Sequence, residues 1–166
     1  MPDWISSDLF SFAGFIGLVI AAAAFGGQWG AGPWYSALSK PSWTPPNWLF
    51  PVAWTLIYLM IAVAGWLVWE GEEPEWPVLL AVWGIQLLAN AVWSYIFFGR
   101  KDVGLALADI AVLWLLIAAF IALAWDGNRL AALLFVPYLA WVGYAGALNA
   151  AIWRRNPVHG RQRTAP

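Results

Sequence analysis

Five long apolar runs divide the sequence and leave few ways for it to fold. They cover residues 9–25, 48–69, 76–98, 103–125 and 130–153, and segments rich in polar residues, glycine or proline separate them. A helix needs about 20 mostly apolar residues to cross a bilayer, and each run falls within the usual range around that length. The pattern predicts an all-α integral membrane protein, a bundle of five transmembrane helices forming a single domain over residues 1–166.

Composition supports a lipid environment and excludes several kinds of function. Hydrophobic residues make up 63% of the chain and charged residues 10%, whereas soluble domains are roughly half apolar and about a quarter charged. The net charge of −1 gives no bulk attraction to nucleic acid. The chain has no cysteine, and its one histidine, His159, lies in the polar tail. The sequence therefore predicts the lipid bilayer as a partner, with no nucleic acid and no metal site.

The distribution of charge predicts an orientation. The first run follows Asp3 and Asp8, where a cleaved signal peptide would carry basic residues, so we expect this run to stay in the protein. With five spans, the side of the first loop, the third loop and the C-terminus holds Lys40, Arg100, Lys101, Arg154, Arg155, Arg161 and Arg163. The opposite side holds Arg129 as its only basic residue, together with Asp3, Asp8, the acidic cluster at 70–75 and Asp126. The positive-inside rule then predicts the N-terminus outside and the C-terminus inside.

A rigid segment lies in the predicted first loop, residues 26–47, and continues into the second run. It reads Lys40-Pro-Ser-Trp-Thr-Pro-Pro-Asn-Trp48. Its three prolines fix φ near about −65° and remove backbone donors, so the loop can keep one shape without a helix or sheet ladder. Such preorganisation favours binding, and the tryptophans favour a flat apolar ligand. We interpret the loop as a lid over a pocket within the membrane.

Several tryptophans of the spans fall into two groups by their depth. One group lies at span ends, where an aromatic belt at the headgroup level explains it: Trp48, Trp69, Trp76, Trp125 and Trp153. The other group lies deeper: Trp54, Trp83, Trp93, Trp114 and Trp141. A deep indole N–H needs a partner, and a deep ring offers a stacking face.

Polar residues inside the spans are the next candidates, because each is costly in hydrocarbon. Gln86 and Asn90 are four residues apart, with Trp83 and Trp93 three residues beyond them on either side. This stripe suits a pocket wall. The two side-chain amides could equally form hydrogen bonds between helices, each contributing about 0.6 kcal/mol. The spacing leaves both interpretations open.

Asp109 is the only carboxylate well inside a predicted span. It could be a proton-coupled transport site or a carboxyl group held by neighbouring tryptophan or backbone donors. The lack of an intramembrane Lys, Arg or His partner favours the second interpretation. Asn149, in the fifth run, could similarly join helices or anchor a loop.

Ordered motifs run along almost the whole chain. The first half carries Lys40-Pro-Ser-Trp-Thr-Pro-Pro46 and Val52-Ala-Trp-Thr-Leu-Ile-Tyr58. The second half carries Gln86-Leu-Leu-Ala-Asn90 with Trp93 and Phe97-Phe98-Gly99, then Ala106-Leu-Ala-Asp109, Pro137-Tyr-Leu-Ala-Trp141 and Leu148-Asn149. Together these motifs resemble one known family, the bacterial tryptophan-rich sensory proteins and the mitochondrial translocator protein, formerly the peripheral-type benzodiazepine receptor.

The resemblance implies a five-helix bundle, commonly a homodimer, with a pocket that opens toward the first loop. The family binds porphyrins such as protoporphyrin IX and drug-like benzodiazepine-site ligands, so a tetrapyrrole is expected as a ligand and no cofactor is required. Carried over to this sequence, Trp54 and Asn90 would contact a ligand carbonyl, while Trp141 and Ala145 would line the wall of the fifth helix. The full expected ligand site is Trp43, Trp54, Tyr58, Gln86, Asn90, Trp93, Trp141 and Ala145.

Three functions follow from the resemblance. The first is binding and sensing of a tetrapyrrole, which would regulate tetrapyrrole or stress responses. The second is transport of a porphyrin or another small molecule, with Asp109 as the proton handle. The third is light-dependent degradation of protoporphyrin IX, because Trp54 and Trp141 match the positions linked to it in some bacterial members. The sequence holds no nucleophile with a base and no nucleotide loop, which argues against conventional catalysis and leads us to favour sensing.

One departure from the family concerns cholesterol. Animal members carry a Leu/Val, Tyr, Lys/Arg pattern at the end of the fifth helix, and such patterns are weak even when present. Here the segment Ala147-Leu-Asn-Ala-Ala-Ile-Trp-Arg154 has alanines where the tyrosine would fall. This speaks against cholesterol binding. The acidic pI of about 5.7 and the predicted N-out topology favour a bacterial membrane, inner or outer.

Overall fold

The computed structural model describes residues 3–71 and 76–157, with side chains from residue 8 onward. These residues form helices and loops with no strand, as the sequence predicts. The elements are α1 (Asp3–Gly27), α2 (Pro33–Ala37), α3 (Leu49–Glu70), α4 (Trp76–Ser94), the π-helix η1 (Tyr95–Gly99), α5 (Val103–Ala124) and α6 (Arg129–Arg155). Most of the acidic cluster at 70–75, and also His159, Arg161 and Arg163, lie outside the described residues.

Within the described residues, five helices are long and apolar enough to cross a membrane, which confirms the predicted number of spans. They run over Asp8–Gly27, Leu49–Glu70, Trp76–Gly99, Val103–Ala124 and Arg129–Arg155. Polar caps begin the last two: Asp102 accepts the Leu105 N–H at 3.0 Å, and Asn128 accepts the Ala131 N–H at 3.1 Å. Each cap satisfies a backbone donor that the first helical turn leaves unpaired.

Two elements add to the predicted pattern. The short helix α2 lies inside the loop of residues 26–47 and begins at Pro33, a favoured first helical residue because it has no N–H to leave unpaired. The π-helix η1 ends the third span, where the Arg100 N–H donates to the Tyr95 carbonyl at 2.8 Å. Lys101 then takes a left-handed φ of 56° and turns the chain into α5.

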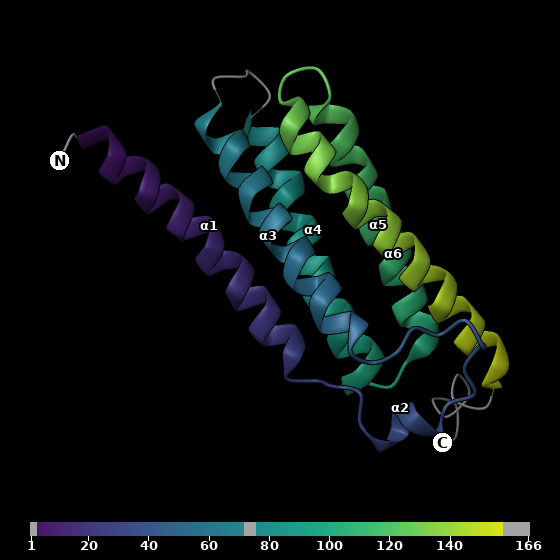
Figure 1. The fold of residues 1–166 in the computed structure, drawn as a ribbon. Helices are drawn as coiled ribbons and strands as arrows, with labels where there is room; N and C mark the ends of the chain where they lie inside the picture. Colours follow the sequence, from purple (N-terminus) through teal and green to yellow (C-terminus); the bar gives the residue numbers. More distant parts are fainter. Residues whose placement is uncertain (1–2, 72–75, 158–166) are drawn as a thin grey trace, which may run out of the picture.

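The spans pack as a bundle (Figure 1). α3 contacts α4 and α6, and α5 contacts α4 and α6, while α1 lies against α3 and α4. The α1 contact centres on Phe15, whose ring meets the Trp83 ring edge-on at 5.1 Å between centroids. The Trp83 indole N–H donates to the Ile61 carbonyl of α3 at 2.8 Å. Gly65 leaves the space in α3 that these two rings fill.

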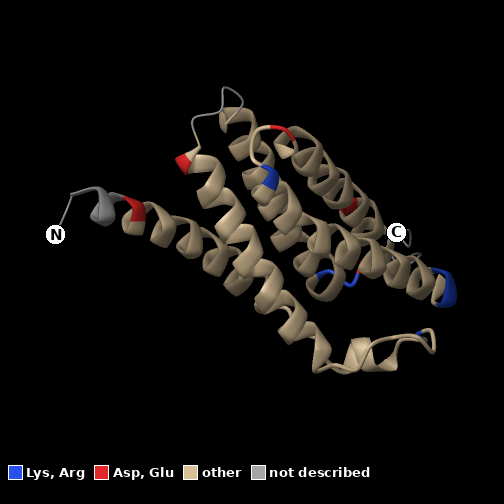
Figure 2. Cartoon of the chain, turned by 45° about the horizontal axis from the view of Figure 1, so that its top comes forward, with Lys and Arg blue, Asp and Glu red and all other residues tan. Residues whose placement is uncertain are grey.

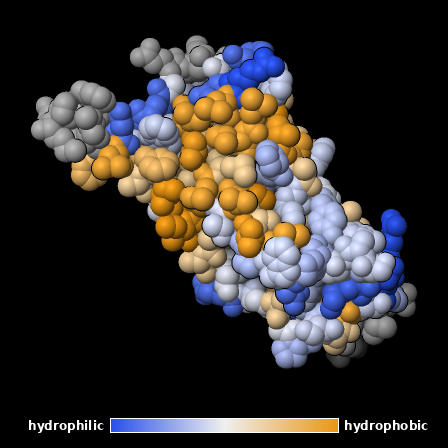
Figure 3. Space-filling view, in the orientation of Figure 1, coloured by the Kyte–Doolittle hydropathy of each residue, from blue (hydrophilic) through white to orange (hydrophobic). Residues whose placement is uncertain are grey.

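The surface agrees with a membrane setting. Charged residues lie mostly at the two ends of the helices (Figure 2). An apolar surface covers the upper part of the face in Figure 3, and a paler surface lies toward α2 and the first loop. Many large apolar side chains of the spans are exposed, Phe10 of α1 the most at 78%. Together with their length and composition, these five helices identify an integral membrane protein.

Candidate functional site

Two aromatic stripes face each other where α3 packs on α6. Phe50, Trp54 and Tyr58 recur every four residues on α3, so they share one helical face. The Phe50 ring lies 5.8 Å from the Trp141 ring, and the Trp54 ring lies 6.3 Å from the Tyr138 ring, both edge-on. Trp54 also packs on Tyr58 at 5.4 Å. The two antiparallel helices therefore present a wall of rings to each other.

A chain of hydrogen bonds, most of them buried, lies beside this wall and joins α3, α4 and α6. The Tyr58 hydroxyl donates to Oδ1 of Asn90 at 2.9 Å, and Nδ2 of Asn90 donates to the Tyr138 hydroxyl oxygen at 2.8 Å. The Tyr138 hydroxyl in turn donates to Oε1 of Gln86 at 3.0 Å. Gln86 and Asn90 thus act as interhelical hydrogen-bonding residues. Because Trp54 packs on Tyr58 and Tyr138, the expected residues Trp54, Tyr58, Gln86 and Asn90 form one group.

The first loop covers the end of this group. The Tyr144 hydroxyl of α6 donates to the Trp43 carbonyl oxygen at 2.7 Å, and the two rings meet edge-on at 5.6 Å. Tyr144 also packs against Trp141 at 6.0 Å. Rings therefore run without a break from Trp43 in the loop to Phe50 in α3. Trp43 itself is 46% exposed, so the loop residue reaches the outside.

Polar contacts fasten the loop to the end of α6. The Ser39 N–H donates to Oδ1 of Asn156 at 3.0 Å, and Nδ2 of Asn156 donates back to the Ser39 carbonyl oxygen at 3.0 Å. The Arg155 guanidinium donates to the Lys40 carbonyl oxygen at 3.1 Å. The part of the loop just before Trp43 is therefore held by the last residues of α6.

Within the loop, Lys40 closes the turn after α2. Its ammonium group donates to the Tyr35 carbonyl oxygen at 2.7 Å and lies 4.6 Å from the centroid of the Tyr35 ring. Burial raises the pKa of the Tyr35 hydroxyl, and the nearby Tyr144 adds to that rise. Tyr35 is therefore neutral at physiological pH and serves as a buried anchor for α2.

Trp93 belongs to a neighbouring cluster of side chains. Its indole N–H donates to Oδ1 of Asn149 at 3.3 Å, and its ring stacks on Phe97 at 5.0 Å. Nδ2 of Asn149 donates to the Val103 carbonyl oxygen at 2.8 Å. Asn149 therefore joins α6 to α4 and α5, which selects the helix-joining interpretation over the loop anchor. The last expected lining residue, Ala145, packs partly buried on the main core.

Asp109 lies on α5 apart from the hydrogen-bonded group. Its Oδ2 atom is buried and has no hydrogen-bond partner among the described residues. No tryptophan or backbone donor among the described residues donates to this oxygen. The interpretation of Asp109 as a carboxyl group held by such donors therefore has no support at this atom. Across residues 3–71 and 76–157, no three His, Cys, Asp or Glu side chains gather to hold a metal ion.

Two buried donors near the wall are unpaired within the described part of the chain. They are the indole N–H of Trp141 and the Nε2 amide of Gln86. A buried donor without an acceptor costs free energy, so the wall carries unused hydrogen-bonding capacity.

The sequence analysis missed three residues that build this region. Tyr138 and Tyr144 flank Trp141 at helical spacing, and an (i, i+3) search from Trp141 would have found them. Asn156 gives no such signal, because its partner Ser39 lies 117 residues earlier in the chain.

Comparison with known proteins identifies the family of this chain. The sequence pattern of the TspO/MBR family matches residues 14–154. Protein CrtK of Rhodobacter capsulatus is 42% identical over 148 residues, 88% of this chain and 92% of that protein. The tryptophan-rich sensory protein of Cereibacter sphaeroides is 40% identical, covering 74% of this chain and 77% of its own. The translocator protein of Homo sapiens is 33% identical, covering 96% of this chain and 94% of its own. This chain therefore belongs to the TspO/MBR family of membrane sensors and translocators.

Proposed function

We propose that this protein binds a tetrapyrrole such as protoporphyrin IX between α3 and α6 beneath the first loop, and acts as a sensor of that ligand. The observation that carries the proposal is the buried, unpaired indole N–H of Trp141 within a continuous aromatic wall. A flat ligand would stack on the rings, and one of its oxygen atoms would accept the indole hydrogen bond. Drug-like benzodiazepine-site ligands with a carbonyl group would use the same features.

The polar contacts expected at Trp54 and Asn90 are compatible with this arrangement. An asparagine amide has two N–H donors, and Asn90 uses one of them for Tyr138. The second can point to a ligand carbonyl without breaking the link between α4 and α6. Gln86 is fully buried, so we assign it to holding Tyr138 and not to direct contact with the ligand.

Entry of a ligand requires the loop to move. The hydrogen bonds between the loop and the end of α6 involve exposed residues, and such bonds contribute little net free energy because water replaces them readily. We therefore propose that the loop opens at Asn156 and Tyr144, and closes again over the bound ligand.

The test is quenching of tryptophan fluorescence by protoporphyrin IX, with the purified protein in detergent and in lipid. We expect saturable quenching whose affinity falls about tenfold or more in Trp141→Phe and in Trp54→Phe, since each removes an indole N–H and keeps a ring. Trp76→Phe is the matched control. Trp76 lies at a span end, and its ring contacts Trp69, which is not part of the aromatic wall. Its affinity should match that of the unaltered protein.

Two results would refute the proposal. Quenching that does not saturate would mean that protoporphyrin IX only partitions into the membrane. Saturable quenching that all three variants leave unchanged would move the site away from α3 and α6.

Transport of the ligand is a second candidate, and Asp109 is the observation that favours it. A carboxyl oxygen without a partner inside a span is costly, and such residues often mark proton paths. Asp109→Asn should then abolish porphyrin uptake into proteoliposomes and leave porphyrin binding unchanged. Uptake equal to that of the unaltered protein would leave binding as the activity.

Light-dependent degradation is testable with the same protein. Illuminated protoporphyrin IX should decay faster with the unaltered protein than with a Trp54→Phe, Trp141→Phe double variant if the two indoles take part. Equal decay at matched ligand occupancy would discard that activity.

We also propose a bacterial membrane with the N-terminus outside and the C-terminus inside. Basic residues at the first-loop end of the bundle support this orientation. Because the chain has no cysteine, single substitutions Arg154→Cys and Asp126→Cys in intact cells give a direct test. A membrane-impermeant thiol reagent should label only the second.

A further inference from the structure

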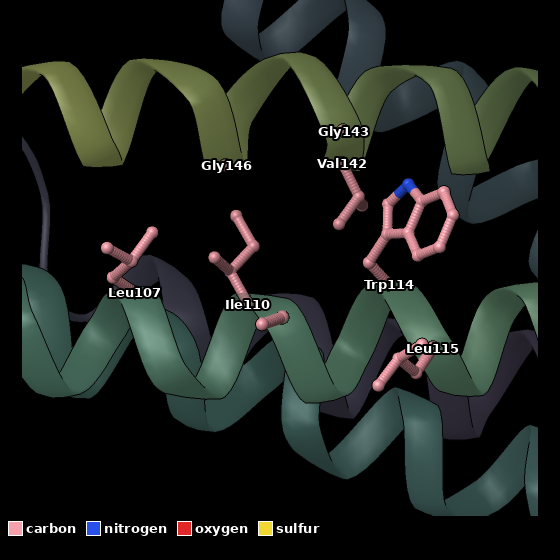
Figure 4. Close-up of a pocket in the computed structure, with 8 residues that line it drawn as sticks. Leu107, Ile110, Trp114, Leu115, Val142, Gly143 and Gly146 are labelled. Atoms are coloured by element: carbon pink, nitrogen blue, oxygen red, sulfur yellow. The ribbon is translucent and has the colours of Figure 1, made fainter.

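An apolar groove runs along the outside of α5 and α6 (Figure 4). Its volume is about 450 Å³, within the roughly 300–1,000 Å³ of small-molecule sites. Leu107, Ile110, Trp114 and Leu115 line it from α5, while Gly143 and Gly146 contribute on α6. The groove lies within two membrane spans, so its surroundings are the hydrocarbon of the bilayer.

The groove is separate from the site beneath the first loop. Successive residues of an α-helix are about 100° apart, so Gly143 lies about 200° around α6 from Trp141. Trp141 faces Phe50 of α3, whereas Gly143 faces Trp114 of α5. A ligand in the groove would therefore contact neither the aromatic wall nor the loop.

Two glycines keep the groove open. A Cβ atom added at Gly143 would lie 3.2 Å from Nε1 of Trp114, closer than most real Cβ contacts, and one added at Gly146 would lie 3.7 Å from Ile110. The polar edge of the Trp114 indole thus lies against the bare backbone of α6, as Figure 4 shows.

The Trp114 indole N–H has no acceptor among the described residues. Trp114 is 39% exposed and lies near the middle of α5, where the bilayer offers no water. The acyl chains of phospholipids offer no acceptor at this depth either, because their ester groups lie at the edge of a hydrocarbon layer about 30 Å thick. An unpaired donor beside an apolar groove selects a ligand with a long apolar body and an oxygen acceptor within it.

We propose that the α5–α6 groove is a second binding site, which takes a bilayer-dissolved lipid carrying a ketone or quinone carbonyl. Its chain lies along Leu107, Ile110 and Leu115, and its carbonyl oxygen accepts the Trp114 indole N–H over Gly143. The proposal does not depend on tetrapyrrole binding under the first loop, because the two sites share no lining residue.

The experiment follows the indole N–H resonances of isotope-labelled tryptophan in lipid nanodiscs. The probes are a symmetric long-chain dialkyl ketone and the alkane of equal length. Trp114→Phe identifies the Trp114 resonance by its loss. The ketone should shift this resonance downfield and saturably, while the alkane should leave it in place. Trp76 is the internal control, because it is also 39% exposed but lies outside the groove; its resonance should not respond.

A Gly143→Ala variant gives a second, independent test of the proposed groove site. Filling the groove beside Nε1 should weaken the ketone response at Trp114 at least fivefold, and unshifted resonances of the remaining tryptophans would show that the fold is kept. Equal shifts with ketone and alkane, a shift that never saturates, or the same ketone affinity in Gly143→Ala would each overturn the proposal. The first two outcomes would mean ordinary contact with bilayer lipid.

Discussion

The side-chain amide of Asn90 donates to the hydroxyl oxygen of Tyr138 at 2.8 Å and so connects α4 to α6 inside the bundle. The Tyr138 hydroxyl also donates to the side-chain oxygen of Gln86 on α4, and the side-chain oxygen of Asn90 accepts from the Tyr58 hydroxyl of α3. One tyrosine hydroxyl thus serves as both acceptor and donor. Since Gln86 and Tyr138 are fully buried, neither can exchange its partner for water.

The first prediction removes that hydroxyl. Tyr138→Phe leaves an Asn90 N–H and the Gln86 carbonyl oxygen unpaired, both buried. Membrane interhelical hydrogen bonds average about 0.6 kcal/mol, but stranded buried partners cost more, so we expect the free energy of unfolding to fall by about 1–2 kcal/mol. The measurement is reversible unfolding in bicelles.

Tyr95→Phe is the control for this change. Tyr95 is 39% exposed and packs through its ring against Trp29, so losing its hydroxyl should change stability by less than about 0.5 kcal/mol. Equal effects of the two substitutions would mean that the buried network adds nothing specific.

The second prediction concerns the contact of α1 with the bundle. A Cβ atom at Gly65 would lie 2.6 Å from the Trp83 ring and 2.8 Å from the Phe15 ring, so both rings would have to shift. Gly65→Ala should lower the free energy of unfolding by about 1–3 kcal/mol through overpacking. Thermal unfolding measured by circular dichroism in detergent would detect the change.

Gly84→Ala on α4 is the matched control, because nothing lies within 4 Å of its added Cβ. Alanine favours a helix over glycine by about 1 kcal/mol, so this variant should be as stable as the unaltered protein or more so. A loss of stability at Gly84 as large as at Gly65 would contradict the packing argument.

These contacts separate what the sequence predicts from what it does not. The five spans follow from apolar length alone, because the bilayer requires about 20 apolar residues per helix. Their starts at Val103 and Arg129 follow from the caps at Asp102 and Asn128, which are local signals. Hydrogen bonds from Arg100 and Asp102 back to Tyr95 and Ile96 accompany the π-helix η1, and no periodicity in the sequence marks this helix.

The candidate site is also predictable only in part, because local signals mark some of its residues but not how they pair. Trp54, Gln86 and Asn90 stand out because polar or indole groups deep in a span are unusual. The pairing of Asn90 with Tyr138 needs the register of α4 against α6, which side-chain packing sets and spacing within one helix cannot give. The same register brings the buried Gln86 to the Tyr138 hydroxyl, so its interhelical hydrogen bond is visible only in the structure.

The third prediction tests whether Asp109 has a structural role. Its Oδ2 atom has no partner among the described residues, and a carboxylate within a span is costly. Asp109→Asn should therefore leave the free energy of unfolding unchanged or raise it, measured in bicelles as for Tyr138. A fall of more than about 1 kcal/mol would reveal a structural partner and weaken the argument for a proton path.

The fourth prediction loosens the first loop without touching the aromatic wall. Asn156→Ala removes both hydrogen bonds to Ser39. Because the bonds are exposed, we expect the free energy of loop opening to fall by only about 1 kcal/mol, and amide exchange at Ser39 to become about fivefold faster. Hydrogen exchange with mass spectrometry of a peptide covering residues 33–48 gives the measurement.

Arg154→Ala is the control for the loop, because Arg154 is exposed on the same turn of α6 and makes no hydrogen bond to the loop within the described residues. In this variant, the amide hydrogen-exchange rates at residues 33–48 should equal those of the unaltered protein. If the loop is the entrance to the site, Asn156→Ala should also speed the association of protoporphyrin IX in stopped-flow quenching. Faster exchange with unchanged association would separate the loop from ligand entry, because the loop would then open without admitting the ligand.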